Sequence, residues 1–150
     1  MSSKARRFID GLPPFISREA ATSFILLSEA IRYMRNDPLS VQSMDFAVSI
    51  IELVKQLKAQ KESIISNQIG RSGTSIGANI HEAQYAHSKP DFIAKLQIAL
   101  KEANETGYWL ELLYRTEYLS EEEYKKLDSA CTSIRVMLIA SINTAKGNSK

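Results

Sequence analysis

The chain has 150 residues, of which 44% are hydrophobic and 24% charged, and its formal net charge is +2. This length and composition are typical of a globular protein with a real core, and the small net charge neither requires nor excludes a nucleic-acid partner. The single cysteine, Cys131, excludes an intrachain disulfide and suits a reducing, cytoplasmic location. Since no apolar stretch approaches the roughly 20 residues needed to span a bilayer, we expect no membrane partner.

The first 40 residues are predicted to form an arm and an extra helix outside the main domain. Gly11, Pro13 and Pro14 indicate irregular structure up to residue 16. A helix then follows to about Arg35, with Ser17 as its N-cap, and the proline of Asn36-Asp37-Pro38 stops it. Its predicted apolar face consists of Ala20, Phe24, Leu27, Ile31 and Met34. The first 35 residues hold six basic and three acidic side chains, a local charge of +3.

Residues 41–150 are predicted to form one domain of four long amphipathic helices. Their expected spans are about 43–60, 64–87, 89–117 and 121–146. Ser88 and the capping box Ser120-Glu121-Glu122-Glu123 begin the last two helices, and Gly147 ends the chain's final helix. Because the connections are short, neighbouring helices should run antiparallel. We therefore expect an all-α fold, an antiparallel up-down-up-down four-helix bundle with an extra N-terminal helix.

The most unusual stretch is the glycine-bearing helix of residues 67–87. Gly70, Gly73 and Gly77 lie beside an apolar face, and each interior glycine costs about 1 kcal/mol relative to alanine. One explanation is that the glycines allow close approach of a neighbouring helix. The other is that bare backbone meets a ligand or phosphate, although the strand and Lys-Ser or Lys-Thr pair of a phosphate loop are missing.

Four further residues are candidates for helix packing or an oligomer interface. Asn79 lies near the apolar seam, three residues before Glu82, and a polar residue there needs a partner across helices or between subunits. Tyr108 and Trp109 are adjacent and point in different directions on a helix. At least one of these two rings is therefore expected to be exposed or in an interface.

No catalytic, metal or cofactor site is predicted. His81 and His87 are six residues apart and lack the Glu-x-x-His pattern of di-metal bundles, so they are expected at the surface. Cys131 lies on an apolar seam without a neighbouring histidine, which favours a buried structural thiol. The glutamates at 102, 105 and 111 are expected to form surface ion pairs with the basic residues of their helix, Lys95, Lys101 and Arg115.

Two blocks of sequence resemble a known protein family. They are QIGRSGTSIGANIHEA at residues 68–83 and FIAKLQIALKEANETGYWLELL at residues 92–113. Together they resemble the bacterial four-helix-bundle proteins encoded in intervening sequences of large-subunit ribosomal RNA genes. That family includes the accessory proteins of diversity-generating retroelements. The resemblance covers about residues 44–145, and residues 1–40 fall outside it.

The resemblance implies a homopentamer without catalysis, and for the retroelement members it implies binding to nucleic acid and a reverse transcriptase. Residues that match the family's signature helix and the block after it are Arg71, Ser75, Asn79, Glu82, Lys95, Lys101 and Glu102. Candidate RNA or DNA contacts are Arg71, Lys89, Lys95 and Lys101. We expect a self-assembling nucleic-acid-binding or accessory module. The alternative is a scaffold that binds a protein partner through Tyr108 and Trp109 without touching nucleic acid.

Overall fold

The computed structural model describes residues 3–11, 17–35 and 37–147, and the regular elements in these ranges are all helices. The helices are α1 (Ser3–Asp10), α2 (Arg18–Arg35), α3 (Pro38–Ala59), α4 (Ile64–Ala83), α5 (Lys89–Arg115) and α6 (Glu121–Lys146). The predicted all-α class is therefore confirmed. The chain divides into two compact units, residues 1–37 and 38–150, and each is described by itself below.

The capping signals read from the sequence act where they were expected. Ser17 Oγ accepts a hydrogen bond from the Ala20 amide (3.1 Å), and Ser88 Oγ accepts one from the Asp91 amide (3.2 Å). At the start of α6 both halves of the capping box form between Ser120 and Glu123. Gly147 ends α6 in the left-handed conformation with φ 77°, which glycine adopts without strain.

The predicted boundaries were wrong in four places. Residues 3–10 form helix α1, although the Gly and Pro residues at 11–14 suggested an irregular arm up to residue 16. The third helix begins at Pro38 instead of residue 43, because a proline is compatible with the first turn of a helix. Helix α4 ends at Ala83 instead of about His87, and residues 84–86 form tighter i→i−3 backbone bonds. Helix α5 ends at Arg115 instead of about residue 117, where Glu117 takes a positive φ of 63°.

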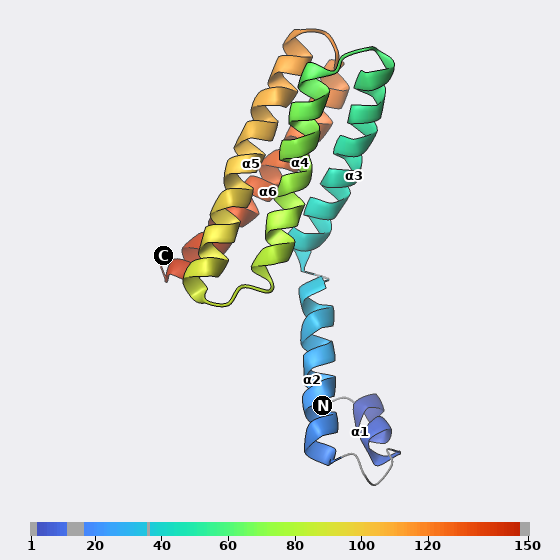
Figure 1. Ribbon diagram of the computed structural model, residues 1–150, viewed down its shortest axis with the longest axis vertical. Helices are drawn as coiled ribbons and strands as arrows, with labels where there is room; N and C mark the ends of the chain where they lie inside the picture. The colour runs from blue at the N-terminus through green and yellow to red at the C-terminus, as the bar shows by residue number, and fades with distance from the viewer. Residues whose placement is uncertain (1–2, 12–16, 36, 148–150) are drawn as a thin grey trace. The chain divides into compact units, whose positions relative to one another are not determined.

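In the unit of residues 38–150, helices α3 to α6 lie side by side around one core (Figure 1). Each helix that follows another along the chain packs against it, and α3 also packs against α6. The apolar side chains that the four helices turn inward are almost fully buried. Large side chains among them that are no more than 2% exposed are Phe46, Ile50, Leu57, Ile69, Ile76, Leu96, Leu110, Leu113, Ile134 and Leu138.

The turn between α3 and α4 is built around a buried carboxylate. Glu62 is 9% exposed, and its Oε1 accepts hydrogen bonds from the amides of Ile64 and Ile65, both at 2.9 Å. Its Oε2 accepts a third from the Ser66 amide at 2.7 Å. One side chain thus satisfies three of the backbone donors that a helix leaves open at its N-terminus. Lys61, one residue earlier, has φ 62°, a conformation that reverses the chain there.

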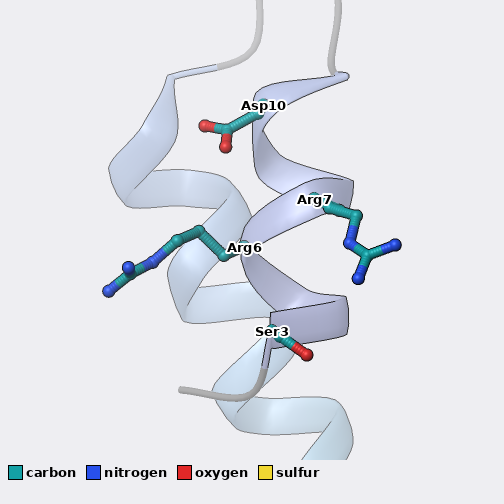
Figure 2. Close-up of a pocket in the computed structure, with 4 residues that line it drawn as sticks. All are labelled: Ser3, Arg6, Arg7 and Asp10. Carbon is teal, nitrogen blue, oxygen red and sulfur yellow. The ribbon is translucent and has the colours of Figure 1, made fainter.

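In the unit of residues 1–37, α1 packs against α2, and Asp10 Oδ1 lies 3.4 Å from Arg18 Nη2. Ala21 is buried, whereas Phe24 and Leu27 of the predicted apolar face are 66% and 60% exposed. Figure 2 shows that Arg6 and Arg7 leave α1 on opposite sides of the helix. Both of these arginines are exposed to solvent.

Candidate interaction surface

The three glycines of α4 face α3 and allow the two helices to lie close together. A Cβ added at Gly73 would lie 2.8 Å and 2.9 Å from Cγ1 and Cγ2 of Ile50. At Gly70 it would lie 3.2 Å from Val54 Cγ2, and at Gly77 it would lie 3.4 Å from the Ser43 carbonyl oxygen. The tightest of these contacts leaves no room for any side chain, because Ile50 is fully buried.

Ion pairs link the outer edges of α4 and α5. Arg71 on α4 donates to Glu102 Oε2 at 3.1 Å and also pairs with Glu105, both on α5. Lys95 on α5 reaches back to Glu82 on α4, with 2.5 Å between Nζ and Oε2. Four side chains from the two sequence blocks, Arg71 with Glu102 and Lys95 with Glu82, thus pair with one another.

The charge pairing shifts the titration of these groups. The hydrogen bond from Arg71, more than any other contact, lowers the pKa of Glu105, although partial burial opposes the shift. Hydrogen bonding to Glu105 and the charge of Glu102 raise the pKa of Arg71. The hydrogen bond to Glu82 likewise raises the pKa of Lys95. The charged forms are favoured, so the pairs persist at neutral pH.

The four candidate cations therefore differ in their surroundings. Arg71 and Lys95 each have carboxylate partners. Lys89 and Lys101 are exposed and make no ion pair within the described part of the chain. Lys89 and Lys101 thus lie outside the ion pairs of the described residues, although the charge of Lys101 acts on Glu105.

The expected pairing of the α5 glutamates was correct only for one of them. Glu111 pairs with Arg115 at 2.5 Å within α5. Glu102 and Glu105 instead pair with Arg71 of the preceding helix. Their partner depends on how α4 and α5 are rotated against each other, which the sequence spacing along α5 does not contain.

Asn79 and Glu82 do not share a hydrogen bond. The Asn79 amide donates to the Ser75 carbonyl oxygen at 2.8 Å within α4, and the residue is half-buried. Glu82 instead forms an ion pair with Lys95. In this chain Asn79 therefore bonds its own helix rather than a neighbouring one.

The aromatic pair divides between core edge and solvent. Trp109 packs against the hydrophobic core, and its Nε1 donates to Glu105 Oε1 at 3.2 Å. Tyr108 is 60% exposed, and its ring meets that of Trp109 edge-on with 4.9 Å between centroids. Tyr108 is the member of the pair that a partner could reach.

Sequence reasoning missed a second apolar row on α3. Val41, Met44, Val48 and Ile51 follow one another at helical spacing, yet they are 43%, 65%, 57% and 42% exposed. We call these four residues the α3 stripe. The core-facing row of the same helix runs through Phe46, Ile50 and Leu53. The signal in the sequence was that α3 carries apolar residues on two faces, which indicates a second buried or interacting surface.

The cysteine is buried, and the described residues hold no metal-binding cluster. Cys131 is fully buried, its thiol donates to the Ala103 carbonyl oxygen at 3.3 Å, and burial raises its pKa to about 11. Across residues 3–11, 17–35 and 37–147, no cluster of three His, Cys, Asp or Glu side chains could hold a metal ion. No helix in these ranges is long and apolar enough to cross a membrane.

Comparisons with known proteins point to one family. Residues 39–140 match the family described as 23S rRNA-intervening sequence protein. A crystal structure of a protein of unknown function from the S23 ribosomal protein family of Bacteroides thetaiotaomicron is 56% identical, with a TM-score of 0.69. That match covers 69% of this chain and 97% of the other. None of the curated proteins matches the chain. Helices α1 and α2 lie outside the family match.

Proposed function

Because the chain belongs to the 23S rRNA-intervening sequence protein family, we propose that it is a non-enzymatic helical protein that assembles with copies of itself. The observation that carries this proposal is the α3 stripe. Within the described residues 38–147 these four apolar residues stay 42–65% exposed, and a row of this kind marks a protein-binding surface. Assembly is the activity that this geometry supports best.

The proposed assembly is a homopentamer of antiparallel up-down-up-down bundles. The ring of contacts α3–α4–α5–α6–α3 and the short connections favour this order of helices. The pentamer itself rests on the resemblance to the intervening-sequence protein family. In such an assembly every copy would contribute the same stripe and the same charged edge.

A second proposed activity is contact with RNA or DNA, and Lys89 and Lys101 are the residues that favour it. Both are exposed and lie outside the ion pairs of the described residues, whereas Arg71 and Lys95 already have carboxylate partners. One copy would neutralise few phosphates, but a ring repeats each lysine in every copy. Each phosphate neutralised on duplex DNA adds about 0.9 to the slope of log affinity against log salt concentration.

A matched pair of variants tests the nucleic-acid contact. Lys101→Glu should weaken retention on RNA or DNA and flatten its salt dependence. Lys58→Glu makes the same charge change on α3, and should leave retention close to wild type. Equal weakening by both variants would mean that the net charge of the protein, and not the position of Lys101, controls binding. Retention unchanged between low and moderate salt would instead favour a protein-binding scaffold, with the exposed Tyr108 ring as a contact.

The assembly proposal is tested by the mass in solution. Val48→Glu places a carboxylate in the middle of the α3 stripe, and Gln97→Glu places one at an exposed site of α5, away from the stripe. Val48 is 57% exposed, so burying the rest of its side chain stabilises an interface by about 1–2 kcal/mol per copy, and a desolvated unpaired carboxylate reverses this gain. Light scattering should show a reduced mass for Val48→Glu alone. If both variants keep the wild-type mass, the stripe is not the assembly surface.

A further inference from the structure

Helix α2 carries an exposed apolar row with the same helical spacing as the α3 stripe. Phe24 and Leu27 are 66% and 60% exposed, and no described residue of the unit 1–37 covers them. In the sequence the same spacing continues at Ile31 and Met34. Exposed apolar side chains of this size on one helix face mark a surface that another protein segment covers.

The two rows are arranged symmetrically along the chain. Phe24 and Ile51 are equally distant in sequence from the midpoint between Asp37 and Pro38, and so are Leu27 and Val48. Residues related in this way come level with each other when two helices pair antiparallel. The spacings of three residues, from Phe24 to Leu27 and from Val48 to Ile51, agree without any shift of register.

We propose that α2 of one copy packs antiparallel along the α3 stripe of a second copy, with Leu27 level with Val48 and Phe24 level with Ile51. This inference rests on the proposed self-assembly and names the segment that occupies its surface. Only residues 36 and 37 connect α2 to α3, and short hinges of this kind favour exchange of an element between copies.

Charge on the flanks agrees with this register. Glu19 at the start of α2 comes level with Gln56, next to Lys55 on α3. Both Glu19 and Lys55 are exposed, and Lys55 already pairs with Glu52 within α3, with 2.7 Å between Nζ and Oε1. The acidic side chain of Glu19 would therefore join an existing ion pair.

The position of α2 in the family supports a separate role for it. The family match begins at residue 39, after α2 has ended. The related Bacteroides protein is covered over 97% of its length by 69% of this chain. Helix α2 is therefore an addition to the shared bundle, and we infer that it supplies this chain with its own cover for the stripe.

Disulfide trapping between two different full-length variants tests the pairing. Leu27→Cys and Val48→Cys chains are mixed and oxidised, and the product is separated without reductant. The buried Cys131 of the wild type serves as the background control. We expect a disulfide-linked species of twice the chain mass that joins one Leu27→Cys chain to one Val48→Cys chain. Leu26→Cys is equally exposed but lies about 100° away from Leu27 around α2, so its mixture with Val48→Cys should give at least fivefold less of this species.

Three outcomes would overturn the inference. The first is equal trapping by Leu26→Cys and Leu27→Cys, and the second is no trapping of either mixture. The third is a Leu27→Cys/Val48→Cys double variant that links only within one chain and keeps the single-chain mass. That last result would place α2 on its own bundle.

A second measurement separates failure of this inference from failure of the proposed function. Leu27→Glu should reduce the mass in solution as Val48→Glu does. If Val48→Glu reduces the mass and Leu27→Glu does not, assembly through the stripe stands and the role of α2 is wrong. If neither variant reduces it, the assembly surface itself is wrong.

Discussion

Gly73 offers the sharpest test of how the bundle is held together. In an isolated helix, glycine to alanine stabilises by about 1 kcal/mol. At Gly73 the added Cβ would lie 2.8 Å from Ile50 Cγ1, 2.9 Å from Cγ2 and 3.3 Å from Cβ. Ile50 is fully buried and β-branched, so it cannot rotate away without moving its own neighbours.

Overpacking of this kind costs about 1–3 kcal/mol, which exceeds or cancels the gain in helix propensity. We expect Gly73→Ala to lower the free energy of unfolding by about 1 kcal/mol, and Gly73→Leu to lower it further. For a chain of this size 1 kcal/mol corresponds to about 2–4 °C in Tm. Urea denaturation at one fixed protein concentration, followed by circular dichroism, measures the change.

Gly107 on α5 provides the matched control. A Cβ added there would meet only Arg135 Nη1, at 3.9 Å. Gly107→Ala should therefore stabilise the protein by up to about 1 kcal/mol, the opposite sign to Gly73→Ala. If Gly73→Ala stabilised the protein as much as Gly107→Ala, the α3–α4 contact would not be as close as described, and the reasoning would fail.

Three other perturbations test the account. Glu62→Ala should lower the free energy of unfolding by about 1–3 kcal/mol in urea denaturation, because three amides at the start of α4 lose their acceptor. Glu62→Gln keeps one acceptor oxygen and should lower it less. Equal losses of stability in the two variants would refute the capping role. The pKa of Glu105 is lowered in the folded protein, so its ion pair stabilises the fold above the pKa of the unfolded chain and loses this effect as pH falls through the folded pKa. The free energy of unfolding should therefore fall more steeply from pH 7 to pH 3 for the wild type than for Glu105→Gln. Parallel curves for the two proteins would contradict this. Burial raises the pKa of the Cys131 thiol to about 11. A thiol reagent at pH 8 should therefore modify the native protein only as fast as the bundle opens, and should modify the urea-unfolded chain at least 100-fold faster. Rapid modification of the native protein would show that the thiol is accessible.

Much of the fold followed from local sequence signals. Ser17, Ser88 and the Ser120-Glu123 capping box began their helices as predicted, because these side chains bond amides a few residues away. Gly147 ended α6 for an equally local reason. Helix α1 was missed because the Gly and Pro residues at 11–14 were taken to make the residues before them irregular as well.

The features that sequence reasoning did not find depend on how helices are rotated against one another. Arg71 lies 31 residues from Glu102, and their pairing exists only once α4 and α5 have packed. The α3 stripe is different, since Val41, Met44, Val48 and Ile51 are visible in the sequence. They were overlooked because the row through Phe46 and Ile50 already accounted for the helix. The structure shows that a single bundle buries only one of the two rows.

The measurement that tests the central claim most directly is the mass of the full-length protein in solution by light scattering, beside that of Val48→Glu. The account predicts a wild-type mass of several chains, near five, and a clearly lower mass for Val48→Glu with its helix content unchanged. A wild-type protein with the mass of one chain would contradict it.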